Sequence, residues 1–292
     1  MGWENVDDFH QKIRLLSDAD WLQCLNNSSL SNVVNEIYMP TFPPEELQVG
    51  VHGHSGRHSI LEAWNYYIEV RNYALFCQHE FHPARRLLDF GSGWGRILRP
   101  FMRDVHPSNI FGVEPNSARI VTARNHNPYV NFIQSRYLPP LPVASDSVDY
   151  IVAWSVFSHI DEFSTRKWFG EFHRILRPGG VLAVTTQRLD FIETCEAIRA
   201  RKQAGETLSH PWHEALARSF VDVEACKSAF ERGEYLHSAT SGAIPKLGAR
   251  YGEAIISPNF VKRELCEGFD FIDYVDNPNR LPQALIVMQK NA

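Results

Sequence analysis

An apolar segment that runs into an acid and a set of alternating glycines is the feature that most constrains this chain of 292 residues. Residues 86–90 predict a buried strand, and the alternating glycines that follow are Gly91, Gly93 and Gly95. A helix is expected to begin at Ile97 and to stop or bend near Pro100. A strand that turns on glycines into a helix presents free backbone N–H groups and a positive helix end at one spot. Since glycine has no Cβ atom, a ligand can come close there. The stretch predicts a cofactor-binding turn.

The spacing of the glycines separates two classes of cofactor. In the dinucleotide fingerprint G-x-G-x-x-G the third glycine would fall at position 96, where this chain has Arg96. The next expected strand, residues 109–114, ends in Glu114, which lies 19 residues after Gly95. A carboxylate at that place can accept hydrogen bonds from both hydroxyls of a ribose without any phosphate contact. The pattern therefore favours a nucleoside-containing cofactor.

From residue 86 onward, strand and helix signals alternate, which indicates a parallel sheet covered on both faces. The strands that we expect in this part are residues 86–90, 109–114, 130–134, 148–153 and 181–186. Residues 269–276 and 283–289 predict two further strands joined by an Asn-Pro-Asn-Arg turn. The fold class expected is therefore α/β.

Several passages resemble the class I S-adenosylmethionine (SAM) methyltransferases. The turn at Asp89 resembles motif I of that family, and residues 135–149 resemble its passage of the form "acidic-x-x-x-LP…D-x-x-F-D". Residues 168–180 resemble the signature L-x-x-x-x-R-x-L-x-P-G-G that precedes the fifth strand. The resemblance covers roughly residues 60–292. It implies an enzyme that uses SAM, built on a doubly wound, Rossmann-like sheet of seven strands that is mostly parallel and has an antiparallel last strand.

The resemblance also implies which residues hold the cofactor. Asp89 is expected near the methionine amino group, and Glu114 is expected to hold the ribose. Many family members have an Asp where Ser135 stands, so the contact with the adenine amino group is left between the Ser135 side chain and the backbone of Arg136 or Tyr137. The full set of expected cofactor-binding residues is Asp89, Gly91, Ser92, Gly93, Gly95, Glu114, Pro115, Ser135, Arg136, Trp154 and Ser155.

The segment after residue 153 supplies the candidate catalytic groups, because the carboxyl ends of the strands line the ligand crevice in a sheet of this kind. His159 is the expected general base, since histidine titrates near physiological pH. Asp161 and Glu162 are the residues expected to orient it, and the alternative is that His159 caps or packs its own helix. A sugar hydroxyl as acceptor would need a base or a metal, whereas positioning alone can suffice for an amine or a carboxylate.

The remaining parts of the chain divide into an arm and an insertion. Residues 1–80 predict a helical N-terminal arm, with a loop at residues 49–56, that either packs on the sheet or covers the SAM pocket with Tyr67 or Tyr73. Residues 81–292 form the expected SAM-binding domain. Within it, residues 188–252 predict an insertion that either forms part of the acceptor pocket or decorates the surface. The side chains of first interest in it are Trp212, His213, Tyr235 and His237.

Composition narrows the choice of partners and location. The net charge of −5 gives no general attraction for phosphate backbones, so no nucleic-acid partner is expected. The five cysteines are scattered, and the histidines at 52, 54 and 58 have no acidic or cysteine partner at ligand spacing, so no metal is expected. An apolar run of 18 residues is absent from the sequence, so we expect no membrane insertion and a cytoplasmic protein.

The function predicted is transfer of a methyl group from SAM to a small-molecule or glycan acceptor, at oxygen and without a metal. The glycan part follows from a resemblance of residues 257–265 to a bacterial subgroup that modifies surface polysaccharides. Protein or RNA methylation, and a non-catalytic module of the same fold, remain as alternatives. An NAD-dependent dehydrogenase is disfavoured by Arg96 and by the C-terminal hairpin. The sequence leaves the oligomeric state open.

Overall fold

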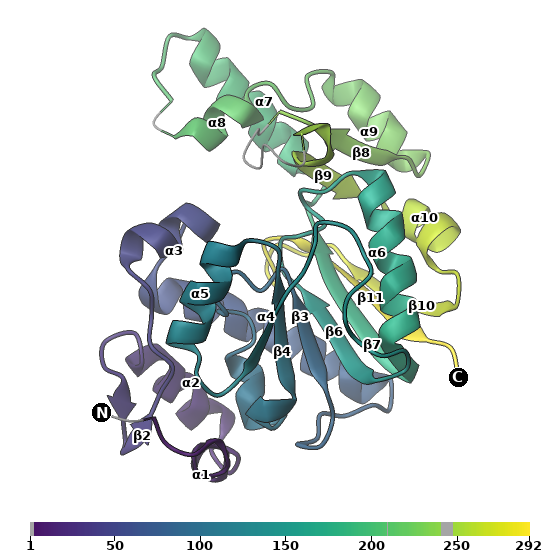
Figure 1. Cartoon of the computed structure of the whole chain (residues 1–292). Coiled ribbons are helices and arrows are strands. Elements are labelled where there is room, and N and C mark those ends of the chain that lie inside the picture. The colour runs from purple at the N-terminus through teal and green to yellow at the C-terminus, as the bar shows by residue number, and fades with distance from the viewer. Residues whose placement is uncertain (1–2, 209, 241–247) are drawn as a thin grey trace.

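One seven-stranded sheet organises the molecule, and its strand order is β10-β11-β7-β6-β3-β4-β5 (Figure 1). The computed structural model describes residues 3–208, 210–240 and 248–292. The strands of this sheet are β3 (Leu87–Phe90), β4 (Ile110–Glu114), β5 (Asn131–Gln134), β6 (Val148–Ala153), β7 (Leu176–Thr186), β10 (Phe269–Val275) and β11 (Ala284–Lys290). β11 pairs antiparallel with both of its neighbours, and the other pairs are parallel. The predicted α/β class, with one antiparallel last strand, is confirmed.

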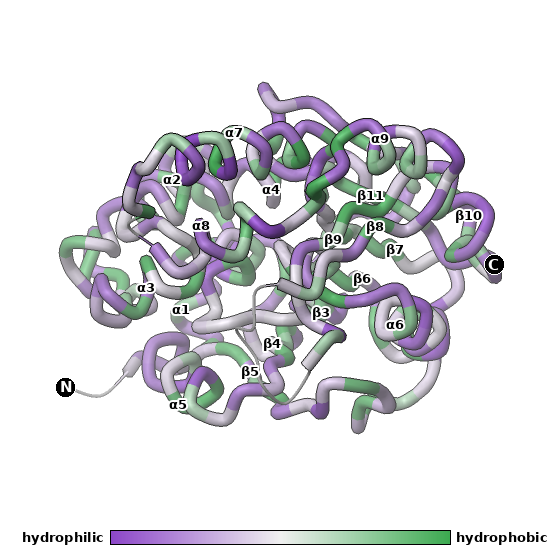
Figure 2. The backbone as a smooth tube through the Cα atoms, turned by 90° about the horizontal axis from the view of Figure 1, so that it is seen from above, coloured by the Kyte–Doolittle hydropathy of each residue, from purple (hydrophilic) through white to green (hydrophobic). Residues whose placement is uncertain are grey.

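The central strands are buried on both faces, which is why they are nearly continuous apolar runs. All four residues of β3 are buried, and Leu87 and Leu88 belong to hydrophobic clusters on opposite faces of the sheet. α4 (Gly56–Phe76) and α5 (Ser117–His126) pack on the first face, and α6 (Glu162–Ile175) packs on the second. Seen from above, β7 and β11 are mainly hydrophobic (Figure 2). The sheet therefore forms a rigid base whose carboxyl edge is available for a site.

The N-terminal arm is mainly helical, as predicted, and contains α1 (Val6–Ile13), α2 (Asp18–Asn27), α3 (Glu45–His52) and α4, with a short hairpin of β1 (Val33–Val34) and β2 (Ile37–Tyr38). The loop predicted at residues 49–56 is wrong, because α3 continues to residue 52. Two acids in its first turn, Glu45 and Glu46, stabilise the helix start, and Gly53, at φ +80°, ends it in the left-handed conformation.

Tyr66 of α4 attaches the arm to the middle of the sheet. Its hydroxyl donates to the carbonyl oxygen of Ala183 at 2.6 Å and accepts from the amide of Ala153 at 3.2 Å. By contrast, the hydroxyl of Tyr67 donates to Asp104 and that of Tyr73 donates to Asp273. The expectation that one of these two tyrosines lies against the cofactor stays a prediction. Tyr66, the residue directly before Tyr67 in α4, is the tyrosine whose hydroxyl bonds to the strands.

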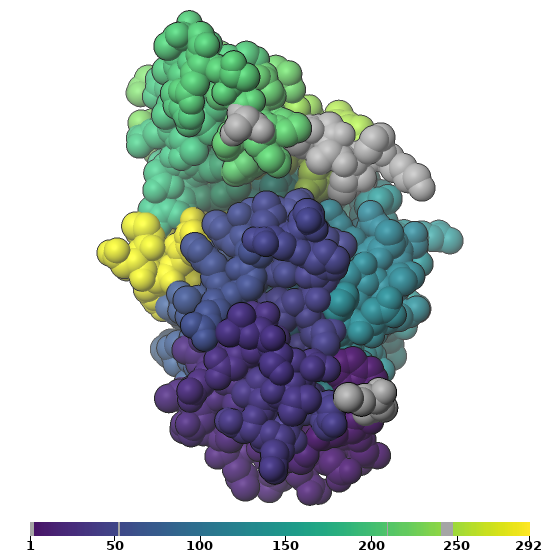
Figure 3. Space-filling view, turned by 90° about the vertical axis from the view of Figure 1, so that its left-hand side faces the viewer, coloured from purple at the N-terminus to yellow at the C-terminus, as the bar shows by residue number. Residues whose placement is uncertain are grey.

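The described residues of the segment 188–252 follow β7 and form a lobe above the carboxyl edge of the sheet (Figure 1). Figure 3 shows the lobe at the top of the molecule. The lobe and its return contain α7 (Phe191–Gln203), α8 (Pro211–Leu216), α9 (Val223–Glu231), β8 (Tyr235–Ser238) and β9 (Glu253–Ile256). The β8–β9 hairpin, which pairs Leu236 with Ile255, was not predicted, because its strands are only four residues long and lie far apart in sequence. The chain then passes through α10 (Pro258–Phe260), capped by Ser257, to β10.

We expect Tyr66→Phe to destabilise the protein by about 1–3 kcal/mol, because it removes a hydroxyl that pairs two buried backbone groups. Urea unfolding of the two proteins measures the difference. Tyr38→Phe is the matched control, since it removes the same atom from a half-buried ring in the β1–β2 hairpin, and it should change the stability by less than about 0.5 kcal/mol. Equal effects of the two substitutions would contradict this attachment.

Candidate active site

The glycine turn after β3 accepts no other residue without rearrangement. Gly91, Gly93 and Gly95 all have positive φ angles, of +75°, +55° and +90°. A Cβ atom on Gly91 would lie 2.3 Å from Cγ2 of Val156, and one on Gly95 would lie 2.6 Å from Nδ2 of Asn127. The turn is therefore packed tightly from both sides. Gly91 and Gly95 are therefore required by the packing of the turn itself.

The backbone N–H groups of this turn are already used within the protein. Those of Gly91 and Ser92 donate to the carbonyl oxygen of Val113, at 2.8 and 2.9 Å. The N–H of Gly93 donates to Glu114, and that of Gly95 donates to the carbonyl oxygen of Ser92. The expectation of free N–H groups is thus wrong for these four residues. Such a turn does not offer an anion cradle of the dinucleotide type.

The helix expected after the turn is also absent. Residues 94–99 form successive turns, and a short 3-10 helix, Pro100–Arg103, follows them. Pro100 has no N–H to continue an α-helical ladder, and the three left-handed glycines before it prevent one from starting earlier. The site therefore has no helix macrodipole directed at it from this segment.

Glu114 ends β4 and is buried beside the turn. Its Oε2 accepts from the N–H of Gly93 at 3.2 Å, and its Oε1 accepts from the N–H of Asn116 at 2.9 Å. Burial raises the pKa of this carboxyl, and the two backbone donors, with Arg119, oppose that rise. Each oxygen still has a free lone pair, so the carboxylate can accept hydrogen bonds from two adjacent hydroxyls of a ligand.

Asp89 lies at the end of β3 with 1% of its surface exposed, and its Oδ2 has no hydrogen-bond partner. Burial raises the pKa of Asp89 to about 7; Arg96 lowers it, and the negative charge of Glu114 adds to the rise. A buried carboxylate without a donor is a costly arrangement. It is the arrangement expected of a group that binds a cationic ligand.

Arg96 occupies the place of the third dinucleotide glycine, and it is a component that we did not predict. Its guanidinium is buried, forms an ion pair with Glu62 of α4 at 2.6 Å and donates to the carbonyl oxygen of Ser59 at 2.9 Å. It also lies close enough to Asp89 to affect that carboxyl. Arg96 therefore connects the glycine turn to the arm. The departure from the dinucleotide pattern at position 96 was the signal for it.

The expected adenine side of the site contains two unpaired hydroxyls. The Oγ atoms of Ser92 and Ser135 are buried and have no hydrogen-bond partner. The N–H of Ser135 donates to the carbonyl oxygen of Glu114 at 3.2 Å, which places this serine next to the end of β4. Pro115 is half-buried and Arg136 is exposed. Together with Asp89, these residues leave three buried polar atoms without a partner at this edge of the sheet.

Trp154 and Ser155 lie where β6 ends. Trp154 is buried and packs edge-to-face on Tyr66, with 5.0 Å between the ring centroids. Ser155 has a φ of +56°; its N–H donates to Oγ1 of Thr185 at 2.8 Å, and its Oγ accepts from Nε2 of Gln283 at 2.9 Å. The ends of β6 and β7 and the start of β11 are thus joined by side chains at this edge.

His159 meets the return segment of the insertion. The N–H of Gly252 donates to the carbonyl oxygen of His159 at 2.8 Å, and Nδ1 of the imidazole lies 2.9 Å from the carbonyl oxygen of Gly252. Because a carbonyl only accepts, Nδ1 must carry a proton there, and Nε2 of the neutral ring keeps its lone pair. The ring of Tyr251 stacks on the imidazole, with centroids 5.3 Å apart. Nε2 is therefore free to act as a base.

The sequence had suggested that Asp161 orients His159, but the hydrogen bonds of Asp161 go elsewhere. Its Oδ1 accepts from the N–H of Ser164 at 2.9 Å and so caps α6, and its Oδ2 lies 3.6 Å from a guanidinium nitrogen of Arg250. The acidic neighbour of His159 is instead Glu253, whose Oε2 lies 3.6 Å from Nδ1. An acid inside an otherwise apolar strand was the sequence signal for Glu253.

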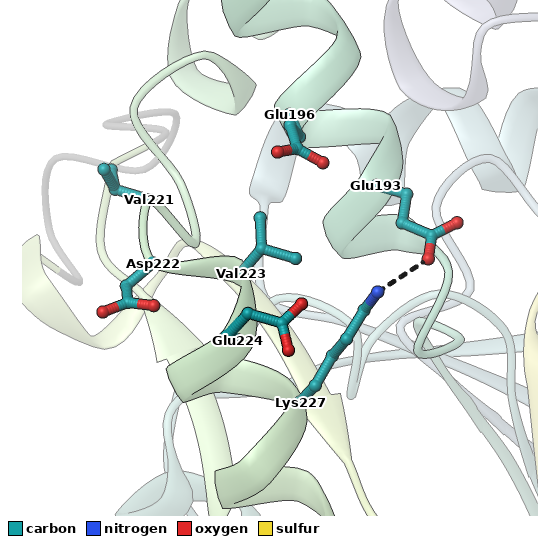
Figure 4. A pocket seen from close by; sticks show the side chains of 7 residues that line it. All are labelled: Glu193, Glu196, Val221, Asp222, Val223, Glu224 and Lys227. Carbon is teal, nitrogen blue, oxygen red and sulfur yellow. Dashed lines mark hydrogen bonds and ion pairs between the residues drawn. The ribbon is translucent and has the colours of Figure 1, made fainter.

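A hollow of about 660 Å³ lies elsewhere, on the outer side of the insertion (Figure 4). It lies between α7 and α9, and Lys227 crosses it to contact Glu193 at 2.9 Å. Its lining residues are Glu193, Glu196, Val221, Asp222, Val223, Glu224 and Lys227. None of them belongs to the glycine turn or to the segment after β6, so this hollow is separate from the site described above.

Two kinds of feature, a metal cluster and a membrane-spanning helix, are absent from the part of the chain that the structure describes. Residues 3–208, 210–240 and 248–292 contain no group of three or more His, Cys, Asp or Glu side chains placed to hold a metal ion. Among the helices in the same part of the chain, none combines the length and the apolar character that a membrane crossing requires.

Comparison with known proteins finds similarity to methyltransferases over part of the chain. Residues 87–180 match a family model described as a methyltransferase domain. A "Probable S-adenosylmethionine-dependent methyltransferase" from Mycolicibacterium smegmatis is 28% identical over 168 residues, which cover 57% of this chain and 59% of the relative. A malonyl-[acyl-carrier protein] O-methyltransferase from Enterobacter lignolyticus is 30% identical over 185 residues, which cover 62% of this chain and 65% of the relative. The chain thus spans less than two thirds of the length of these curated relatives.

A solved structure agrees with the sheet topology. The "putative S-adenosylmethionine dependent methyltransferase" from Listeria monocytogenes is 14% identical, with a TM-score of 0.52, and the likeness covers 79% of this chain and 100% of that one. This likeness shows the fold. Taken with the sequence matches, it shows that the chain contains a methyltransferase domain and is similar to SAM-dependent methyltransferases, as the sequence resemblance had indicated.

Asp89→Asn should stabilise the ligand-free protein more at pH 8 than at pH 5. Burial raises the pKa of the Asp89 carboxyl to about 7 in the folded protein. The wild-type protein is therefore most stable below about pH 4, where this carboxyl is neutral in both the folded and the unfolded state. It loses that stability as the pH rises to about 7. Asparagine stays neutral throughout. The gap between variant and wild type should thus widen with pH, toward roughly 4 kcal/mol for a shift of about three pKa units.

Urea unfolding at both pH values, without SAM, measures this effect. Asp270→Asn is the control, because that carboxyl is exposed on β10 and its loss should change the stability by a similar small amount at both pH values. A difference between Asp89→Asn and wild type that stays constant from pH 5 to pH 8 would show that burial does not hold a proton on Asp89.

Proposed function

We propose that this protein transfers the methyl group of SAM to a hydroxyl oxygen of a small-molecule or glycan acceptor, without a metal ion. The observation that carries the proposal is the pairing of two features at the carboxyl edge of one sheet. Asp89 and Glu114 have unused acceptor capacity at the ends of β3 and β4, and His159 has an available Nε2 after β6. The first feature suits a cofactor and the second suits an acceptor that must lose a proton.

The cofactor would be held by groups that the chain leaves unsatisfied. Each oxygen of Glu114 has one lone pair left after its backbone bond, so the carboxylate can accept from both ribose hydroxyls. Asp89 would accept from the methionine ammonium group, and Ser135 would accept from the adenine amino group. Close contact with the turn is possible because Ser92 lies between glycines. The remaining contacts would come from Gly91, Gly93, Gly95, Pro115, Arg136, Trp154 and Ser155.

When bound, SAM supplies an electrophilic methyl group. The chain must then hold the acceptor oxygen in line with that group and remove its proton. His159 is the proposed base, because the bond from Nδ1 to Gly252 leaves Nε2 unprotonated in the neutral ring. The insertion would complete the acceptor pocket, since residues 250–254 run directly beside His159. Asp161 would act only on the position of α6, as its cap.

Transfer to oxygen is also favoured by one relative, which is named as an O-methyltransferase. The same name specifies an acceptor attached to an acyl-carrier protein. A protein-bound acceptor is therefore the second candidate, and it fits the same residues around His159. The net charge of −5 favours either candidate over RNA.

Calorimetric titration should show micromolar binding of SAM and of its demethylated product, and Glu114→Gln should weaken it about 10- to 100-fold. The glutamine side chain has one oxygen in place of two and carries no charge, so at least one charge-assisted bond to the ribose is lost. Glu231→Gln, which changes an exposed residue at the end of α9, should bind as the wild type does. Failure of the wild-type protein to bind either ligand would sink the methyltransferase proposal.

Transfer of a labelled methyl group should depend on His159. With SAM labelled in its methyl group and a panel of free sugars and glycan precursors, His159→Gln should lower the rate by roughly 10²- to 10⁴-fold for hydroxyl acceptors, because the proton then has no base to receive it. SAM binding should be unchanged. His82→Gln, on the surface, is the control. An unaltered transfer rate in His159→Gln would remove the general base from the mechanism.

A further inference from the structure

We propose that Glu253, which the insertion supplies, is a positioning residue for His159 and stabilises the protonated imidazole during methyl transfer. The proposal rests on the proposed function of His159 as the base. It makes the insertion part of the proton-transfer machinery as well as a wall of the acceptor pocket.

The backbone holds the two residues side by side. Residues 250–254 run along residues 158–161 as an added strand: the N–H of Ala254 donates to the carbonyl oxygen of Ser158, and that of Asp161 donates to the carbonyl oxygen of Arg250, at 2.8 and 3.0 Å. An antiparallel bridge joins Ile160 and Tyr251 between them. The pairing fixes the position of β9 relative to the segment after β6. It does not depend on the side chains that it brings together.

The carboxylate of Glu253 is only partly satisfied. The residue is fully buried, and its Oε1 accepts from Nε1 of Trp212 at 2.8 Å. Its Oε2 has no hydrogen-bond partner and lies 3.6 Å from Nδ1 of His159. A buried carboxylate oxygen with no donor is unfavourable unless a positive charge appears beside it. The imidazole is the group that can supply this charge.

The surroundings contain few competing charges. Burial raises the pKa of Glu253, the charge of His159 opposes that rise, and hydrogen bonds from Trp212 and Gln187 also oppose it. Burial raises the pKa of Tyr251 to about 12 and that of Cys195 to about 12, so both are neutral. Burial lowers the pKa of His237 on β8, whose imidazole is therefore mostly neutral near pH 7. Asp161 is engaged with α6 and Arg250.

The two partners of Nδ1 have different effects on the imidazole. The neutral carbonyl of Gly252 fixes the tautomer and leaves the lone pair of Nε2 available to take a proton. As the acceptor oxygen bonds to the methyl carbon, the bond from that carbon to sulfur breaks and its electron pair goes to sulfur, while the acceptor proton moves to Nε2. The ring then carries a positive charge, which the nearby carboxylate stabilises. Glu253 thus acts through His159 and need not touch the acceptor.

Direct titration of the imidazole in the full-length protein tests the proposal without an acceptor. In protein labelled with ¹³C at Cε1 of histidine, the signal that is absent from His159→Gln belongs to His159. Its titration midpoint should fall by about one pH unit or more in Glu253→Gln, because the neighbouring negative charge is lost. Glu214→Gln, which removes an exposed carboxylate elsewhere in the insertion, should leave the midpoint unchanged. An unchanged midpoint in Glu253→Gln would overturn the proposal.

A second variant separates charge from packing. Trp212→Phe removes the hydrogen bond to Oε1 but keeps the carboxylate, so the midpoint should stay within a few tenths of the wild-type value; a fall as large as that in Glu253→Gln would assign the effect to packing and contradict the proposal. SAM calorimetry on the same samples distinguishes the two hypotheses. Loss of SAM binding by the wild type defeats the proposed function, whereas intact binding with an unmoved midpoint defeats only the role of Glu253.

Discussion

The carboxylate of Glu114 joins the two segments on which the site depends. By accepting from Gly93 and Asn116, it ties the turn after β3 to the start of α5, while the backbone of β4 takes the N–H groups of Gly91 and Ser92. The turn is therefore closed by bonds within the protein before any ligand arrives. What remains for a ligand is acceptor capacity, and this explains why a site with a glycine turn suits a cationic nucleoside better than a phosphate.

Buried charges connect this turn to the rest of the chain. Asp89 is unpaired, Arg96 lies between it and Glu62, and Glu62 belongs to the long helix that also carries Tyr66. The arm is thus attached to the sheet by an ion pair and a buried hydroxyl as well as by apolar packing. Because a buried ion pair loses most of its value when one partner is removed, arm and turn are expected to act as one structural unit.

The sequence predicted the elements that local residue patterns determine. The five parallel strands and the C-terminal hairpin follow from apolar runs and periodicity, and all are present. The helix after the glycine turn was wrong because pattern alone does not reveal how left-handed glycines and Pro100 act together. Glu253 was missed because its partner, His159, is 94 residues away in the sequence. The cofactor and catalytic roles of individual residues stay predictions, although most of these residues lie at one edge of the sheet.

The lobe of residues 188–252 has its own hydrophobic core, in which Ile192, Cys195 and Leu216 are completely or almost completely buried. Its chain leaves from β7 and returns through β9 beside the same edge of the sheet. Such a lobe can vary in length and side chains while the sheet and the turn stay intact. Under the proposed role of the lobe in the acceptor pocket, acceptor preference would then change through substitutions in the lobe alone, provided that the strand carrying Glu253 keeps its register with the segment of His159.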